Sequence, residues 1–244
     1  MPEGPSIVIL RELAENFKGR EILRAEGNSK IDIQRLVGQT IQSIRSWGKH
    51  FLIELPGFSL RIHFLMFGSY KINERKDVVP RLSLQFADDQ ELNFYACSVK
   101  YVEGALDEHY DWRTDVMSDL WDAAAALKKL RATPEKFACD ALLDQDIFAG
   151  VGNIIKNEVL FRIRVHPLST IGALPAAKLR DLVKHARQYS FEFLEWKKQY
   201  VLREHWLAHN KRDCPRCKIS YTKAYLGKTN RRSFFCQQCQ KKYQ

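Results

Sequence analysis

Two pairs of cysteines near the carboxy-terminal end constrain the fold of this chain most. Cys214-Pro-Arg-Cys217 and Cys236-Gln-Gln-Cys239 are both C-x-x-C pairs, and the segment 218–235 separates them. Each pair presents two thiolates from one tight turn, and two such turns can enclose a zinc ion tetrahedrally. Two disulfides are the alternative, but the sequence shows no secretory signal, which favours zinc. Because the segment from Cys214 onward is too short to bury a core alone, we predict one structural Zn²⁺ per chain and no catalytic metal.

Positive charge is concentrated in the same part of the sequence. The net charge is +10, yet residues 196–244 hold 13 Lys or Arg against two acids, whereas residues 1–195 hold 26 basic and 27 acidic groups. Such a segment is typical of a polyanion-binding appendage, with a solvated tail as the alternative. Five aromatic residues favour a folded module: Trp206, Tyr221, Tyr225, Phe234 and Phe235. No apolar run approaches the length of about 20 residues that a membrane-spanning helix needs, so we expect no membrane span.

The hydrophobic pattern changes along the chain and predicts an α+β protein. Residues 5–18 have helical spacing, and Gly19 ends that segment. Short apolar stretches separated by turn residues follow from about residue 21 to residue 103, which indicates antiparallel strands. Residues 107–133 read as a linker with a short helix, and the chain then becomes helical to about residue 200. Cys97 and Cys139 are isolated and are expected to be buried thiols.

Two short motifs carry chemistry. Met1 precedes Pro2 and is the kind of residue that aminopeptidases remove, which would leave a secondary amine beside the carboxyl group of Glu3 as a nucleophile and an acid. The second motif, Ala149-Gly150-Val151-Gly152-Asn153, places two glycines before a predicted helix with Asn153 as its cap. The helix start could bind a phosphate, and a simple turn with a helix cap is the alternative.

The Pro-Glu start, the segment LLDQDIFAGVGNIIKNEVLFRIRVHP and the cysteine pairs resemble, in this order, the formamidopyrimidine-DNA glycosylase/endonuclease VIII family of base-excision repair enzymes. The resemblance implies three domains. These are an amino-terminal helix with a two-layer antiparallel β-sandwich (residues 1–110), a linker and helix-two-turn-helix domain (111–210), and a four-cysteine zinc-finger hairpin (211–244). It also implies a bifunctional DNA glycosylase and abasic-site lyase that acts on damaged double-stranded DNA.

The resemblance assigns the catalytic residues as well. Pro2 becomes the nucleophile that displaces the damaged base from C1′ and forms an iminium, whose positive charge assists β- or β,δ-elimination. Glu3 protonates the sugar ring oxygen and then shuttles protons. Lys49 in WGKHFLI matches the β-hairpin lysine that partners phosphate and the active-site acid, with an ordinary strand-edge lysine as the alternative.

The family also uses side chains that hold DNA and fill the gap left by the extruded base. The residues that match these positions are Asn153, Arg231, Met66 and Phe67. Asn153 and Arg231 are the expected phosphate ligands, and Arg232 is expected to be solvated. Met66 occupies the main wedge position, Phe67 lies beside it, and Leu65 is expected to belong to the core.

Three departures from the family pattern bear on the substrate. Ser6 stands where a second glutamate is usual, Asp140 stands where a lysine is common, and residues 95–100 lack the Asp-Pro-Arg-Arg-Phe pattern of the oxidised-purine branch. These departures favour oxidised pyrimidines. The alternatives are an oxidised-purine glycosylase, a catalytically inactive DNA-binding homologue and an RNA-binding zinc-ribbon protein. We further expect a monomeric, cytoplasmic protein that is associated with the nucleoid if the source is bacterial.

Overall fold

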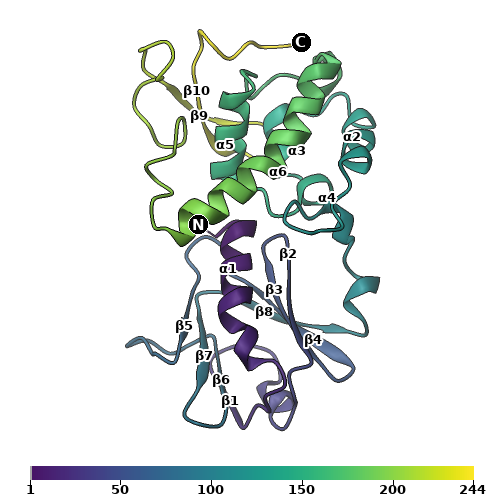
Figure 1. Ribbon diagram of the computed structural model, residues 1–244, viewed down its shortest axis with the longest axis vertical. Coiled ribbons are helices and arrows are strands. Elements are labelled where there is room, and N and C mark those ends of the chain that lie inside the picture. Colours follow the sequence, from purple (N-terminus) through teal and green to yellow (C-terminus); the bar gives the residue numbers. More distant parts are fainter. Residues whose placement is uncertain (1) are drawn as a thin grey trace. The chain divides into compact units, whose positions relative to one another are not determined.

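The computed structural model describes residues 2–244, so the expected removal of Met1 concerns a residue outside the described part. The chain divides into two compact units, the first ending at Asp111 and the second running from Trp112 to Gln244 (Figure 1). Within residues 2–244, no helix combines the length and the apolar character needed to cross a membrane.

Two four-stranded antiparallel sheets form most of the first unit. The first sheet has the order β2-β3-β4-β8 and the second has the order β1-β6-β7-β5. The strands are β1 (Arg24–Glu26), β2 (Ser43–Trp47), β3 (His50–Leu55), β4 (Phe58–His63), β5 (Ser69–Ile72), β6 (Leu82–Gln85), β7 (Glu91–Tyr95) and β8 (Ser98–Glu103). Short 3-10 turns lie at Glu15–Phe17, Ile33–Leu36 and Leu106–Glu108.

One hydrophobic core joins both sheets to the amino-terminal helix α1 (Gly4–Ala14). Leu10 of α1, Phe51 of the first sheet and Phe94 of the second are all fully buried in it. The helix is shorter than the predicted segment 5–18, because the chain continues from Glu15 as a 3-10 turn before Gly19 adopts φ 79°. Short apolar stretches thus form the strands, several of which bury consecutive residues, and α1 contacts strands β2 and β3.

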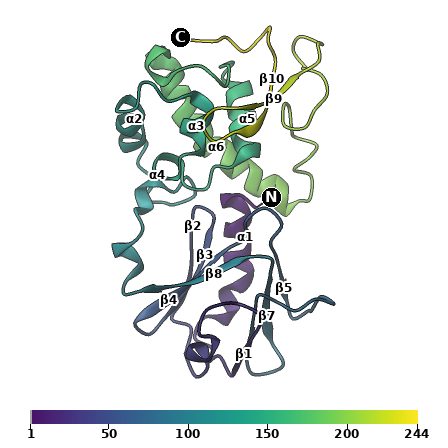
Figure 2. The same ribbon diagram turned by 180° about the vertical axis from the view of Figure 1, so that it is seen from behind.

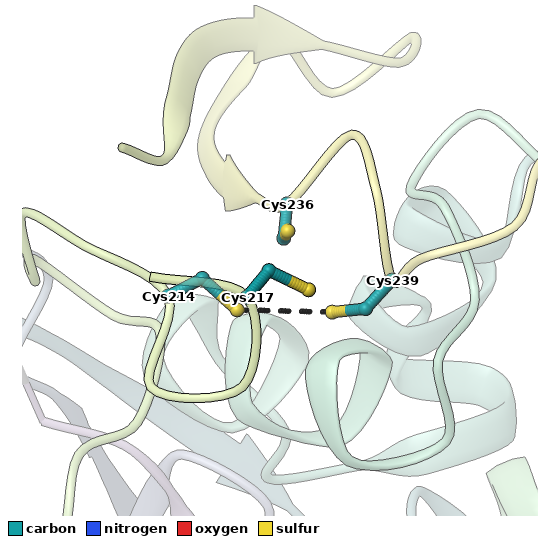
Figure 3. Close-up of side chains that lie close together, drawn as sticks. All are labelled: Cys214, Cys217, Cys236 and Cys239. Carbon is teal, nitrogen blue, oxygen red and sulfur yellow. Dashed lines mark hydrogen bonds between the residues drawn. The ribbon is translucent and has the colours of Figure 1, made fainter. Parts of the chain in front are cut away.

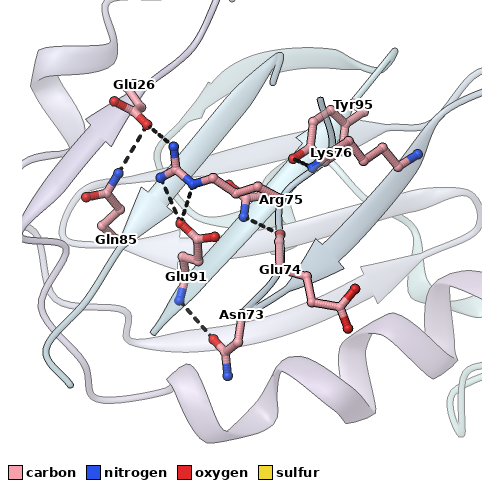
Figure 4. A network of polar contacts seen from close by, with 9 residues as sticks. Glu26, Asn73, Glu74, Arg75, Lys76, Gln85, Glu91 and Tyr95 are labelled. Atoms are coloured by element: carbon pink, nitrogen blue, oxygen red, sulfur yellow. Dashed lines mark hydrogen bonds and ion pairs between the residues drawn. The ribbon is translucent and has the colours of Figure 1, made fainter. Parts of the chain in front are cut away.

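A polar network fixes the loop between β5 and β6 on the outside of the second sheet (Figure 4). The Arg75 guanidinium donates to Glu91 at 2.8 Å and to Glu26 at 2.7 Å, and Gln85 also donates to Glu26. The two carboxylates raise the pKa of Arg75 above its usual range. Because this network ties β1, β6 and β7 to the loop, it serves the sheet and not the candidate site.

The second unit is helical with one small sheet. Its helices are α2 (Ala123–Arg131), α3 (Ala138–Leu143), α4 (Gln145–Phe148), α5 (Asn153–Arg162) and α6 (Ala176–Lys198), with 3-10 turns at Trp112–Thr114 and Ile171–Ala173. Strands β9 (Thr222–Leu226) and β10 (Arg231–Phe235) form an antiparallel hairpin.

Helix α5 lies at the centre of the second unit. It contacts α3, α6 and β10, and both ribbon views place the β9–β10 hairpin beside it (Figures 1 and 2). The core of this unit buries residues of α2, α3, α5 and α6, among them Cys139, Ile155 and Phe193. The predicted α+β class is therefore confirmed, as is the burial of both isolated cysteines, Cys97 and Cys139.

Candidate functional site

The first unit presents the predicted nucleophile and acid at the start of α1. Pro2 is half-buried, and Glu3 is fully buried immediately before the first helical residue. The Glu3 carbonyl accepts the N–H of Ser6 at 2.8 Å, so its backbone begins the helix. Pro5 within the first turn favours this start because its fixed φ suits a helix and its missing N–H costs nothing there. The Glu3 side chain is thus held inside the protein, and Glu3 directly follows Pro2 in the sequence.

Lys49 occupies the turn of a tight hairpin. Trp47 pairs with His50 across the end of β2 and β3, which leaves only Gly48 and Lys49 in the loop. Gly48 has φ 54°, a conformation that suits glycine at the first central position of a two-residue hairpin turn. The turn therefore projects the half-buried Lys49 from the end of a sheet instead of from a long loop.

Two histidines lie beside this lysine. The rings of His50 and His63 are paired across β3 and β4, with centroids 5.4 Å apart. Burial lowers the pKa of His50 to about 3, and the charges of Arg61, His63 and Lys49 act in the same direction. Burial also lowers the pKa of His63, and the positive charges of Lys49 and Arg61 lower it further. Both imidazoles are therefore neutral near pH 7, and Lys49 is a nearby positive charge that acts on both.

The loop after β4 carries the predicted wedge residues. Met66 is 50% exposed and Phe67 is 83% exposed, so neither belongs to the core. Leu65 is 52% exposed with φ 52°, and the prediction that it is a core residue is wrong because the chain turns at this point and Phe64 is buried instead. The Leu65 N–H donates to Nδ1 of His63 at 3.2 Å, which connects the loop to the histidine beside Lys49.

The glycine-rich turn before α5 is braced by Gln145. Its side-chain oxygen accepts the N–H of Gly150 at 3.1 Å, and its nitrogen donates to the Val151 carbonyl at 3.2 Å. Gly150 has φ 100°, which explains the requirement for glycine. The helix cap is Gly152, and Asn153 is the first helical residue, so the prediction that Asn153 caps the helix is wrong. The Asn153 side chain reaches another segment instead.

That segment is β10, which carries Arg231. The carbonyl of Arg232 accepts the side-chain amide of Asn153 at 2.9 Å and the ammonium of Lys156 at 3.2 Å. Lys156 is completely buried and also donates to the Ser233 hydroxyl at 2.7 Å. The structure thus connects the two predicted phosphate ligands, since Asn153 bonds to the backbone of the residue after Arg231.

The helix also holds β10 further along the strand. Asn157, one residue after Lys156, accepts the N–H of Phe234 at 3.0 Å through its side-chain oxygen. Both groups are buried, so this hydrogen bond satisfies a donor that water cannot reach. Polar side chains at three positions of α5, Asn153, Lys156 and Asn157, therefore hold the strand that carries Arg231.

The next residue of α5 holds the segment that leads to the cysteines. The Glu158 carboxylate is fully buried and accepts three backbone N–H groups, from Leu207, Ala208 and His209, at 2.7 to 2.9 Å. Burial raises the pKa of Glu158, while these three hydrogen bonds and Arg162 oppose the rise. This carboxylate therefore serves the architecture of the second unit.

The four predicted metal ligands come together. The sulfur atoms of Cys214, Cys217, Cys236 and Cys239 all lie within 4.8 Å of one another, and those of Cys214 and Cys239 are 3.8 Å apart (Figure 3). Four thiolates at such separations form a set that can hold one metal ion, and four protein ligands are typical of a structural site.

A glutamine connects this cluster to the loop after α5. Gln240 is buried, accepts the N–H of Cys236 at 2.9 Å and donates to the Val165 carbonyl at 2.9 Å. Arg216, between the first two cysteines, donates to the Phe161 carbonyl at 2.8 Å and lies 4.0 Å from the centre of the Phe161 ring. The two cysteine turns are thus attached to α5 and to the loop that follows it.

Sequence reasoning missed several of these residues. His50 and His63 could have been found from the sequence, because His50 directly follows Lys49 and His63 lies three positions before Met66. Lys156 and Asn157 gave no such signal, since a lysine and an asparagine inside a helix are ordinarily read as solvated.

Comparison with known proteins finds a family domain that matches each of the two units. Residues 1–97 match the family model of the formamidopyrimidine-DNA glycosylase N-terminal domain, and residues 114–201 match that of the formamidopyrimidine-DNA glycosylase H2TH domain. The expected helix-two-turn-helix domain is thereby confirmed.

Curated relatives include Endonuclease 8-like 3 of Xenopus laevis, which is 31% identical over 90% of this chain and 38% of the relative. Endonuclease 8-like 2 of Bos taurus is 33% identical over 74% of this chain and 58% of the relative. The chain thus spans about two fifths of the length of the first of these relatives.

Solved structures show the same fold. The Lactococcus lactis formamidopyrimidine DNA glycosylase, bound non-covalently to DNA containing an AP site, has a TM-score of 0.85 at 22% identity, over 98% of this chain and all of that one. A viral DNA glycosylase also has a TM-score of 0.85, at 20% identity over 98% of this chain and all of that one. From its two family domains, its relatives and its fold, the chain belongs to the formamidopyrimidine-DNA glycosylase/endonuclease VIII family.

Proposed function

We propose that this protein is a bifunctional DNA glycosylase and abasic-site lyase of base-excision repair. The observation that carries the proposal is the Pro2-Glu3 start in a member of this family, with the Glu3 carboxyl group buried at the first turn of α1. Once Met1 is removed, Pro2 is a secondary amine followed by the buried acid Glu3, and these are the nucleophile and the acid that attack at C1′ of a deoxyribose requires.

The proposed reaction uses the Pro2 nitrogen after removal of Met1. This nitrogen bonds to C1′ as the bond from C1′ to the damaged base breaks, and the base leaves with the proton that the nitrogen gives up. Glu3 then protonates the sugar ring oxygen, and the ring opens to an iminium between the nitrogen and C1′. The iminium acidifies the C2′ proton, and the Glu3 carboxylate, which has given up its own proton, accepts it. The electron pair of the C2′–H bond moves toward the iminium to form an enamine, which then expels the 3′ phosphate by β-elimination. An α-amino group with its ordinary pKa of about 8 retains a usable neutral fraction at pH 7.

Lys49, Asn153 and Arg231 are the proposed phosphate ligands. The amide nitrogen of Asn153 carries two hydrogens, and the Arg232 carbonyl takes only one of them, which leaves a donor for DNA. Met66 and Phe67 are the proposed wedge that replaces the extruded base, and their exposure supports this role. Oxidised pyrimidines are the proposed lesions, with oxidised purines as the alternative.

We also propose that the four cysteines hold one structural zinc ion and that catalysis needs no metal. Their clustered sulfur atoms fit the tetrahedral site that zinc prefers. Metal analysis of the purified protein should give one zinc per chain. A folded preparation that binds DNA but contains no zinc would contradict this assignment.

Borohydride trapping tests the central proposal. Incubation with a duplex that contains one abasic site should give a reduced protein–DNA adduct, and peptide mapping should locate it at residue 2. Retaining Met1, or adding an amino-terminal tag, should abolish the adduct and strand cleavage while DNA binding survives. An adduct at Lys49, or full activity of the tagged protein, would overturn the assignment of Pro2. A panel of duplexes with single defined lesions then separates oxidised pyrimidines from oxidised purines.

A further inference from the structure

Asp140 contacts the tip of the β9–β10 hairpin. It lies in the first turn of α3 and is 7% exposed. Its carboxylate accepts the backbone N–H of Lys228 at 2.9 Å, the backbone N–H of Thr229 at 3.0 Å and the Thr229 hydroxyl at 2.7 Å. Hydrogen bonds to a carboxylate are stronger than those between neutral groups, and three of them converge here. One side chain of α3 thus accepts hydrogen bonds from three donors in the turn of a hairpin that lies far along the sequence.

The shape of the turn matches this carboxylate. Gly227 has φ 74°, and a Cβ atom at this position would lie 2.5 Å from both carboxylate oxygens of Asp140. Any larger residue would therefore be strained in its backbone and would also displace the anchor. The glycine and the aspartate form one structural unit although they lie far apart in the sequence.

The anchored turn leads directly to the proposed phosphate ligand. Arg231 follows Thr229 by two positions and pairs with Leu226 at the start of β10. On its other side, the Arg232 carbonyl is held by Asn153 and Lys156 of α5. The backbone of Arg231 therefore lies between two fixed points, one supplied by α3 and one by α5.

We infer that Asp140 is a positioning residue for DNA binding, because it fixes the turn that orients Arg231 toward a phosphate. The inference rests on the proposed function in assigning that phosphate to Arg231. It also gives a role to a residue that appeared in the sequence only as a departure from the family lysine. Asp140 does not touch DNA in this scheme, and its effect passes through the hairpin.

Amide hydrogen exchange of the zinc-loaded protein without DNA tests the anchor itself. Asp140→Ala should accelerate exchange at Lys228 and Thr229 by about tenfold or more, and Thr229→Val, which removes only one of the three bonds, should give about threefold. Asp146→Asn is the matched control, since this exposed aspartate in α4 loses the same charge and should change nothing. Exchange in both the Asp140 and Thr229 variants equal to that of the unaltered protein would overturn the inference.

A double-mutant cycle on DNA tests the positioning role. Binding to a duplex with one uncleavable abasic analogue is measured from low to moderate salt for Asp140→Ala, Arg231→Ala and the double variant. Each single change should reduce the salt-dependence slope by about one unit, and the double variant should lose no more than either. Additive losses would overturn the positioning role. If Arg231→Ala leaves the slope unchanged while Asp140→Ala accelerates exchange, the phosphate role of Arg231 in the proposed function fails and the anchor stands.

Discussion

Two hairpins present the proposed cationic ligands, and they are supported in different ways. The β2–β3 hairpin that carries Lys49 belongs to a four-stranded sheet, and its turn is formed by Gly48 and Lys49 alone. The β9–β10 hairpin that carries Arg231 is a sheet of two strands. An isolated pair of strands is only marginally stable in water, so the second hairpin needs other supports.

Those supports are side chains from helices. Asp140 of α3 holds the turn, while Asn153, Lys156 and Asn157 of α5 hold β10. The first hairpin obtains its rigidity from backbone ladders, and the second obtains it from buried polar groups and, in our proposal, from zinc. Substitutions in the turn of the first hairpin should therefore alter chemistry with little change in stability at neutral pH, whereas substitutions around the second hairpin should alter stability and DNA binding.

The largest expected effect is at the first hairpin. Lys49→Gln should reduce excision by about 100-fold, because the variant lacks the positive charge that we propose to stabilise the reacting phosphate and acid. Thermal unfolding should stay unchanged, since the sheet holds the turn. Single-turnover excision, DNA affinity and melting temperature are the measurements, with the exposed Lys18→Gln as control. An equal loss of DNA affinity and of excision would instead show that Lys49 binds DNA equally in the ground state and in the transition state.

At the second hairpin, Asn157→Ala should destabilise the protein by about 2 kcal/mol, because the buried N–H of Phe234 would lose its acceptor and an unsatisfied buried donor is costly. Urea unfolding measures the change, and the exposed Gln238→Ala serves as control. A stability unchanged within error would show that β10 does not depend on α5.

Acid should weaken both hairpins, because a half-buried neutral imidazole lies at each of them. His50 follows Lys49, and His209 lies against Phe234 with ring centroids 5.3 Å apart. Burial lowers the pKa of His50 to about 3 and that of His209 to about 4. Between these values and the unfolded value of about 6.5, the unfolded state binds the extra proton. The contribution of each neutral histidine to the stability of the folded protein is therefore complete above a pH of about 6.5 and is lost as the pH falls.

The two histidines can be separated by substitution. The free energy of unfolding should fall between pH 7 and pH 5 in the unaltered protein. In His50→Gln and in His209→Gln this fall should be smaller by up to about 2 kcal/mol. Urea titrations at several pH values give the slopes. A pH dependence identical to that of the unaltered protein would show that the substituted histidine protonates without unfolding.

The smallest expected effect lies in the loop beside the first hairpin. Met66→Ala should reduce excision from a paired duplex by about tenfold, because unstacking is no longer compensated by a wedge. Cleavage at a ready-made abasic site and the melting temperature should be nearly unchanged. Val79→Ala, at another exposed apolar residue of the first unit, is the control. Equal losses on both substrates would argue against a wedge.

Patterns of neighbouring residues predicted the strands, the helices and the cysteine cluster. Contacts between residues far apart in the sequence decided which individual side chains are buried and what they bind. Short apolar stretches separated by turn residues predicted the strands, and the spacing of the cysteines predicted the metal cluster. Both signals could be read because the residues of each lie close together in the sequence. Leu65 was misjudged because burial there depends on a turn that places Phe64 inside. Asp140 could not be interpreted, since its partners belong to a hairpin far along the chain. Asn153 was misplaced by one position, as is usual at helix starts.

Gln240 shows whether the cysteine segment can be exchanged for that of a relative without changing the rest of the protein. Its two hydrogen bonds connect the second cysteine turn to Val165, and the neighbouring Lys241 pairs with the same residue in a parallel bridge. A cysteine turn transplanted from a relative would therefore have to reproduce a backbone partner that lies far upstream in the sequence. Chimeras that exchange only the cysteine segment should thus misfold more often than those that carry the α5 region with it.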